Sequence, residues 1–181
     1  MKIHILGASG SGVTTLGQVL ADKLEVPYFD ADSFYWEKSD PPFTVKRKPA
    51  DRNAMLATAL TRAEHWVLGG SALNWGDKLL PEFDLVVFLW LPPATRIKRL
   101  EQREIERYGD IIFTDPARNK QYLDFMDWAR DYDHDTGVAK RTLNLHESWL
   151  SSIDCPVLRI EGDFSVEKRM ELVLEILGLE D

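Results

Sequence analysis

A glycine-rich stretch near the start of the chain has residue types and spacings that suit the binding of phosphate groups. It reads Gly-Ala-Ser-Gly-Ser-Gly-Val-Thr-Thr from Gly7 to Thr15 and follows an apolar run, Ile3 to Leu6. Glycines permit the backbone turns that aim successive N–H groups into one concavity, and a helix that begins there adds its positive end. The sequence therefore predicts that backbone amides of residues 7 to 15 hold a polyanion.

The stretch has the Walker A spacing but lacks its lysine. Gly7, Gly12 and Thr14 occupy pattern positions, and Val13 stands where the lysine would be. The Thr14 hydroxyl is expected to ligate Mg²⁺, whereas the valine supplies no charge to the outer phosphates. A turn that serves only the backbone is the alternative. The residues expected to bind the nucleotide are Gly7, Ala8, Ser9, Gly10, Ser11, Gly12, Val13, Thr14 and Thr15.

Two carboxylates, Asp30 and Asp32, directly follow the second apolar run, Val26 to Phe29. Open α/β sheets bind ligands at the carboxyl ends of their strands, and alternate residues of an extended chain point the same way. One carboxylate can then hold Mg²⁺ while its neighbour accepts a proton. A capping or turn pair is the alternative. The third strand ends in glycines rather than an acid, which favours Asp32 as the metal ligand.

Four arginines recur at three- and four-residue spacings on one expected helix, namely Arg96, Arg99, Arg103 and Arg107. Residues at these spacings lie near one another on a helix, so their guanidinium groups can replace the charge of the missing lysine. The alternative is a solvated face on which they pair with Glu101, Glu104 and Glu106.

Aromatic and cationic residues gather in the region expected to hold the phosphate acceptor. They are Phe34, Tyr35, Trp36, Lys46, Arg47, Lys48 and Arg52. Flat apolar faces beside cations suit a phosphorylated or aromatic acceptor, although exposed cations beside a core cluster would give the same pattern. Trp75, near Asn74 and Asp77, is expected to pack rather than bind.

Short apolar runs alternate with helical periodicities along the chain. The expected strands are residues 3–6, 26–29, 66–68, 84–91 and 157–160, and the expected helices are 14–24, about 51–63, about 94–107, one through His146, and 166–177. This alternation predicts a parallel sheet in one three-layer α/β domain spanning residues 1–181. Residues 108–140 look less regular, and we expect them to form a mobile lid.

Four segments together resemble the adenylate kinase-like and shikimate kinase-like group of small P-loop kinases. They are Gly-Ala-Ser-Gly-Ser-Gly after the first strand, Asp30-Ala31-Asp32 after the second, Gly69-Gly70-Ser71 after the third, and Thr95 to Arg107 after the fourth. The resemblance covers nearly the whole chain. Within the group, the chain is similar to uncharacterised members that lack the Walker lysine. It implies a five-stranded parallel sheet of order 2-3-1-4-5, a helical lid, ATP and Mg²⁺. By this likeness Arg103 and Arg107 enter the lid, and Arg141 lies at its far side.

Composition limits the remaining functions. The 181 residues carry a formal charge of −8, which disfavours non-specific binding to nucleic acid or to anionic membranes. The single cysteine excludes an intrachain disulfide, and the N-terminal apolar run is too short for a signal peptide, so we expect a cytoplasmic protein. No apolar stretch approaches the length of a membrane helix.

These observations favour a magnesium-dependent kinase that moves the terminal phosphate of ATP to a small acceptor, a class of molecule that includes nucleotides. The catalytic candidates are Asp32, Asp30, Arg103, Arg107 and Arg141, and the metal ligands are Thr14 and Asp32. A non-catalytic nucleotide sensor is the second hypothesis, because the lysine is absent. A kinase that modifies nucleic acid is the third, and the acidic composition argues against it.

Overall fold

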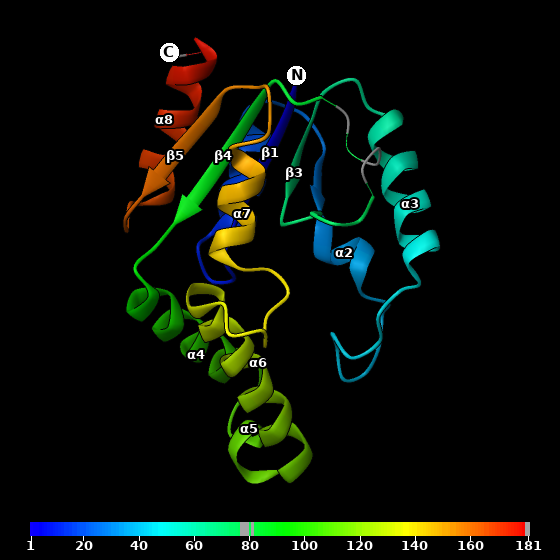
Figure 1. Cartoon of the computed structure of the whole chain (residues 1–181), viewed down its shortest axis with the longest axis vertical. Coiled ribbons are helices and arrows are strands. Elements are labelled where there is room, and N and C mark those ends of the chain that lie inside the picture. Colours follow the sequence, from blue (N-terminus) through cyan, green and yellow to red (C-terminus); the bar gives the residue numbers. More distant parts are fainter. Residues whose placement is uncertain (77–79, 81, 180–181) are drawn as a thin grey trace.

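A single five-stranded parallel sheet organises the protein, which is described here from a computed structural model covering residues 1–76, 80 and 82–179. The strand order is β2-β3-β1-β4-β5 (Figure 1). The strands are β1 (Lys2–Gly7), β2 (Tyr28–Asp30), β3 (Trp66–Gly69), β4 (Leu85–Trp90) and β5 (Val157–Glu161). Both the parallel sheet and its order agree with the expectation from the sequence.

Helices surround the sheet and extend beyond one end of it (Figure 1). They are α1 (Val13–Lys23), α2 (Ala31–Tyr35), α3 (Pro49–Thr61), α4 (Pro93–Tyr108), α5 (Ile111–Thr114), α6 (Pro116–His134), α7 (Leu143–Leu150) and α8 (Val166–Leu177). No helix in the described part of the chain is long and apolar enough to cross a bilayer.

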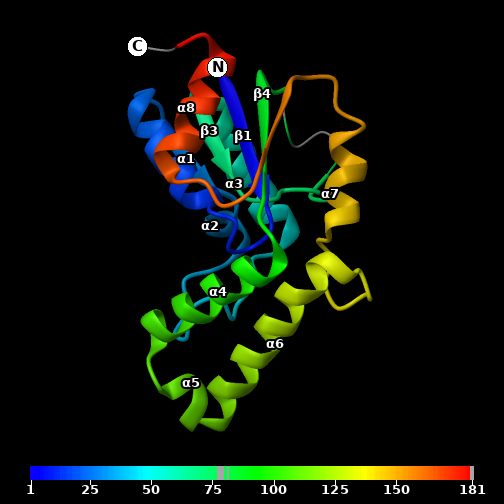
Figure 2. The ribbon, with the colours of Figure 1, turned by 90° about the vertical axis from the view of Figure 1, so that its left-hand side faces the viewer.

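Alternation of side chains along the strands produces three layers. On β4, Leu85, Val87 and Leu89 join a core cluster with α1 and α8, whereas Val86 and Phe88 join another with α7. Successive side chains of a strand point to opposite faces, so a strand buried on both faces reads as a continuous apolar run. Figure 2 shows α1 and α8 on one face of the sheet and α7 on the other.

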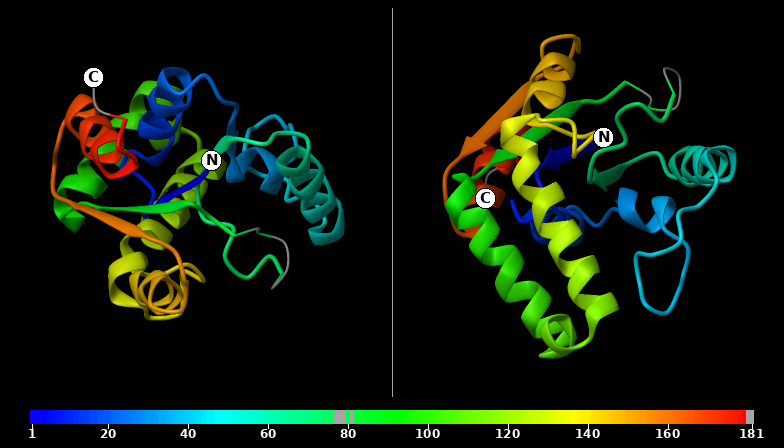
Figure 3. Two further views of the ribbon diagram at one scale, coloured as in Figure 1. Left: turned by 90° about the horizontal axis from the view of Figure 1, so that it is seen from above. Right: turned by 60° about the horizontal axis from the view of Figure 1, so that its bottom comes forward.

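The carboxyl ends of the strands gather the residues of chemical interest at one edge. The phosphate loop follows β1, Asp30 ends β2, and Gly69 ends β3 in register with both Ile5 and Asp30. Helices α4, α5 and α6 form a hairpin that projects from the same edge (Figures 1 and 3). The topology therefore places the loop, the carboxylates and the arginines of α4 around one opening.

The expectation that residues 108–140 are irregular is wrong. They contain the short α5 and all of α6, a helix of 19 residues. The Asp115 carboxylate caps α6 by accepting from the Arg118 amide at 2.8 Å, and Pro116 stands in the first turn, where a proline is tolerated. Only a narrow stripe, including Met126 and Ala129, is buried against α4, which explains why its periodicity was hard to read.

Candidate functional site

The loop after β1 presents backbone amides that have no acceptor within α1. The first helical bond runs from the Leu16 amide to the Gly12 carbonyl at 3.0 Å, and no side chain caps the helix at Gly12. The amides that precede Leu16 therefore lack an intrahelical partner, although the Ser11 amide donates to the Ala8 carbonyl at 3.1 Å within the loop. Such donors, together with the positive end of the helix dipole, can hold an anionic oxygen.

Two glycines of the loop are required by their surroundings as well as by their backbone angles. Gly10 has φ of 85°, and a Cβ there would lie 2.9 Å from the Leu100 side chain. Gly12 has φ of 97°, and a Cβ there would lie 2.6 Å from Nη1 of Arg169. Side chains are disfavoured at such φ values, so the loop can take this shape only with glycine at both positions.

Val13 contributes to the core rather than to the polar surface of the loop. Its partly buried side chain packs against the cluster that contains Leu16 and Leu20 of α1. The position of the Walker lysine is thus occupied by an apolar contact, and any cation near the loop must come from another element.

Thr14 and Asp30 connect the loop to the end of β2. The exposed Thr14 hydroxyl donates to Oδ2 of Asp30 at 3.3 Å, and Oδ1 of Asp30 accepts from the Asp32 amide at 2.9 Å. Asp30 therefore caps α2, as the alternative interpretation of this pair required. The two carboxylates do not alternate on an extended chain, because Asp32 already belongs to the first turn of α2.

Asp32 lies beside arginines from two other elements. The surrounding protein raises the pKa of its carboxyl by desolvation; Arg141 opposes this shift, Asp30 adds to it, and Arg103 opposes it. Asp32 is an exposed residue, and within the described residues its carboxylate accepts no hydrogen bond. The fold thus brings Asp30, Asp32, Arg103 and Arg141 together across more than a hundred residues of sequence.

The arginines of α4 have different surroundings. Arg96 is 1% exposed, donates to the Ala129 carbonyl at 2.9 Å and forms an ion pair with Asp133, which gives it a structural role. Arg103 and Arg107 both face Glu104, at 3.1 and 3.9 Å, and both remain partly exposed. Arg107 lies over the Phe43 ring, 5.3 Å from its centroid. Arg103 and Arg107 thus pair with Glu104, as the alternative interpretation of these arginines described, whereas Arg96 is buried.

Cations and rings on the acceptor side are stacked on one another. The Arg52 guanidinium is buried 4.0 Å from the Trp75 ring centroid and 5.7 Å from that of Tyr35. Lys46 lies 5.9 Å from the ring centroids of Tyr35 and Trp36. Trp75 packs as expected and also walls this region, whereas Asp77 lies outside the described residues.

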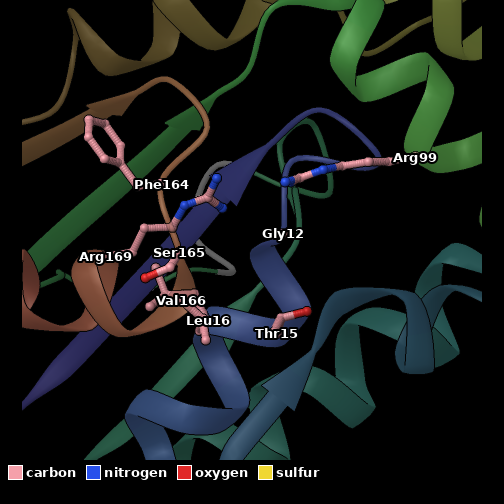
Figure 4. A pocket seen from close by; sticks show the side chains of 8 residues that line it. All are labelled: Gly12, Thr15, Leu16, Arg99, Phe164, Ser165, Val166 and Arg169. Carbon is pink, nitrogen blue, oxygen red and sulfur yellow. The ribbon is translucent and has the colours of Figure 1, made fainter.

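A pocket of about 200 Å³ opens beside the loop and was missed by the sequence interpretation. Its lining consists of Gly12, Thr15, Leu16, Arg99, Phe164, Ser165, Val166 and Arg169 (Figure 4). Arg99, from α4, forms an ion pair with Asp163 at the pocket rim. Arg169 had one readable signal, because it interrupts the apolar stripe of Val166, Met170 and Val173 on α8.

Comparison with known proteins identifies relatives over most of the chain. The chain is 43% identical over 177 residues to the uncharacterized protein YqaC of Bacillus subtilis, covering 98% of this chain and 97% of that protein. It is 31% identical over 124 residues to a shikimate kinase of Caldicellulosiruptor bescii, covering 61% of this chain and 72% of that enzyme. No protein-family model matches the chain.

Solved structures support the same assignment at the level of the fold. A shikimate kinase from Bacteroides thetaiotaomicron superposes with a TM-score of 0.58 at 18% identity, covering 99% of both chains. A deoxyadenosine kinase from M. mycoides superposes with a TM-score of 0.57 at 16% identity, covering 98% of this chain and 99% of that one. With this sheet order, this phosphate loop and this sequence identity, the chain belongs to the small P-loop kinase family that includes the shikimate kinases.

Proposed function

We propose that the protein is an ATP- and Mg²⁺-dependent phosphotransferase that acts on a small acceptor, either a metabolite or a nucleotide. One observation carries the proposal: the open amides of the loop face the same edge of the sheet as Asp32, Arg103 and Arg141. A donor phosphate and an acceptor hydroxyl need this combination, because phosphoryl transfer depends on positioning and on neutralising charge. The kinase relatives support the reaction class.

The residues around Thr14 fit a magnesium ion. Mg²⁺ prefers hydroxyl, carboxylate and phosphate oxygens and keeps several waters, so it needs only one or two protein ligands. Thr14 offers a solvent-exposed hydroxyl and Asp32 offers a carboxylate without hydrogen bonds among the described residues. When bound there, the ion would supply positive charge to the outer phosphates.

Each remaining residue has a definite task in this proposal. The backbone of Gly7 to Thr15 holds the phosphates, while Asp30 orients the Thr14 hydroxyl and caps α2. The oxygen of the acceptor hydroxyl forms a bond to the γ-phosphorus while the bond from that phosphorus to ADP breaks. Asp32 accepts the proton that this hydroxyl loses. Arg103, Arg107 and Arg141 then lie around the transferred group when residues 108–140 close as a lid.

In the pocket beside the loop, the end formed by Arg99 and Phe164 accommodates the base of ATP, and the end formed by Gly12, Thr15 and Arg169 lies next to the phosphates. The planar groups of Arg99 and Phe164 can stack on a base. The acceptor would occupy the other side of the loop, between Asp32 and the rings of Tyr35 and Trp75. Donor and acceptor thus approach the phosphate loop from opposite sides.

Val13 favours a second candidate, a nucleotide sensor that binds ATP without transferring phosphate. The lysine of this loop normally contributes charge to the outer phosphates, and its loss lowers the capacity for transfer more than that for binding. A sensor would still bind ATP and Mg²⁺ at the loop.

An assay with γ-labelled ATP separates the two candidates. The protein is incubated with labelled ATP, Mg²⁺ and a pool of small hydroxyl-bearing metabolites and nucleotides, and products are identified by mass. A kinase labels one acceptor class, and Asp32→Asn abolishes this labelling while ATP still binds. Saturable ATP binding with no labelled product from any acceptor would instead establish the sensor.

A further inference from the structure

Arg169 is a buried cation that touches the phosphate loop from the closing helix. Its side chain extends from α8, is 4% exposed, and donates through Nη1 to the Ser11 carbonyl at 2.6 Å. Nη2 donates to the Gly162 carbonyl at 3.4 Å, and among the described residues the buried Nε has no hydrogen-bond partner. Through Nη1 the guanidinium charge therefore lies directly against the loop.

Arg99 repels the charge of Arg169, and Asp163 attracts it from beyond ion-pair distance. Within residues 1–76, 80 and 82–179, Arg169 forms no ion pair, whereas Arg96, Arg99 and Arg159 pair with Asp133, Asp163 and Glu147. A buried charge without a counterion is unfavourable, and arginine stays protonated even when burial lowers its pKa, as it does here. An anion bound at the loop would offset this penalty.

The position of Arg169 matches the place where phosphate charge would accumulate. Its Nη1 lies 2.6 Å from where a Gly12 Cβ would be, and Gly12, Thr15 and Arg99 share its pocket. Figure 4 shows Arg99, from α4, and Arg169, from α8, with their guanidinium groups near Gly12. Val13 meanwhile packs into the core and carries no charge to this space.

We propose that Arg169 supplies, from α8, the positive charge that the loop lysine supplies in other Walker A proteins. The inference rests on the proposed function, since it assumes that the loop binds nucleotide phosphates. Arg169 stabilises those phosphates electrostatically and holds the Ser11 carbonyl, so that the loop amides stay aimed at them. Its loss should weaken triphosphate binding far more than nucleoside binding.

Calorimetric titrations with ATP, ADP and adenosine, each with Mg²⁺, test this role in Arg169→Met and Arg169→Lys. Charge-assisted hydrogen bonds are worth a few kcal/mol, so Arg169→Met should bind ATP about 10- to 100-fold more weakly. Adenosine affinity should change little, and Arg169→Lys should recover part of the loss. Lys168→Met is the matched control, because it removes an exposed cation one residue away that pairs with Glu171.

The double variant Val13→Lys/Arg169→Met separates charge from structure. A lysine at position 13 should restore triphosphate affinity to the protein, although it cannot restore the hydrogen bond to the Ser11 carbonyl. Unchanged ATP binding in Arg169→Met would overturn the inference. An equal loss of ATP and adenosine binding in Arg169→Met, recovered neither by Arg169→Lys nor by Val13→Lys/Arg169→Met, would also overturn it. If the wild-type protein binds no ATP, the proposed function itself fails, which is a different result.

Discussion

Thr14 and Asp30 are joined by a hydrogen bond of 3.3 Å across 16 residues of sequence. The same Asp30 carboxylate caps α2, so one anionic group contacts both the phosphate loop and α2. Asp30→Asn keeps a good capping residue but loses the charge, whereas Asp30→Ala loses both. We expect Asp30→Ala to lower the free energy of unfolding by about 1 kcal/mol and Asp30→Asn to lower it much less.

Both variants should lose Mg²⁺-dependent phosphoryl transfer to a similar degree, because each removes the negative charge beside Thr14. Urea denaturation and the turnover assay measure the two properties separately. Full activity in Asp30→Asn would show that only the cap matters.

Asp32→Asn should stabilise the protein while abolishing transfer. The pKa of Asp32 is raised by desolvation and by Asp30, so the folded state holds this proton more tightly than the unfolded state. Stability therefore falls as pH rises from the unfolded value of 3.8 through the raised folded pKa, and then stays constant. At pH 7 the wild-type protein carries this penalty, reduced by the solvent around the exposed side chain, and Asn removes it.

Melting temperatures across pH check this sign. The Asp32→Asn variant should melt higher than wild type at pH 7, and the difference should shrink in acid. Its transfer rate should drop by about 100-fold or more, the usual contribution of a proton acceptor. A variant that melts lower at pH 7 would contradict the assigned environment.

Arg96 links the loop side of α4 to α6 and should matter for stability. Its guanidinium is buried, pairs with Asp133, and donates to the Ala129 carbonyl. Breaking a buried pair leaves an uncompensated charge, so Arg96→Met should lower the free energy of unfolding by about 3 to 5 kcal/mol. Lys120→Met, which breaks the exposed pair with Asp124, should change it by less than about 0.5 kcal/mol. Comparable effects of the two variants in denaturant titrations would refute this distinction.

Two buried histidines predict a loss of stability in mild acid. Burial, with a smaller contribution from His146, lowers the pKa of His4 to about 3, and burial with Arg141 lowers that of His146 to about 4. Below pH 6.5 the unfolded state takes up protons that the folded state refuses, so stability decreases as pH falls. At pH 5 each histidine should lower the free energy of unfolding by about 2 kcal/mol.

His4→Phe tests the contribution of one of them. The ring of His4 stacks on Phe83 with centroids 5.0 Å apart, so a phenyl group fits the same surroundings. Between pH 7 and pH 5, the free energy of unfolding of the variant should fall by about 2 kcal/mol less than that of the wild type. Identical pH profiles of His4→Phe and wild type would disprove the assignment.

The fold was predictable where periodicity was strong. Val166–Leu177 and the apolar runs of β1 and β4 carry patterns that burial enforces, and their positions agree with the structure to within a residue or two. Helix α6 was not predictable, because few of its residues are buried, one of those is the charged Asp131, and the apolar Leu123 is exposed. The periodicity of apolar residues reflects which face of an element is buried, so an element with few buried residues shows little periodicity.

The candidate site was only partly predictable, for a related reason. Loop residues and Asp30 follow strands directly, so their place at the sheet edge follows from parallel topology. Arg169 reaches the loop from 158 residues away through its side chain, and its charge on an apolar stripe was the only local signal. The different surroundings of Arg96, Arg103 and Arg107 depend on their packing partners, which helical spacing does not report.

Backbone amide shifts of ¹⁵N-labelled protein, followed during titration with ATP and Mg²⁺, test most directly whether the loop binds phosphate. We expect saturable shifts that are largest between Ala8 and Thr15, with smaller changes at Arg99 and Arg169. Adenosine alone should leave the loop amides nearly unshifted. Saturable binding that leaves residues 8–15 unshifted, or no binding at millimolar ATP, would contradict the account.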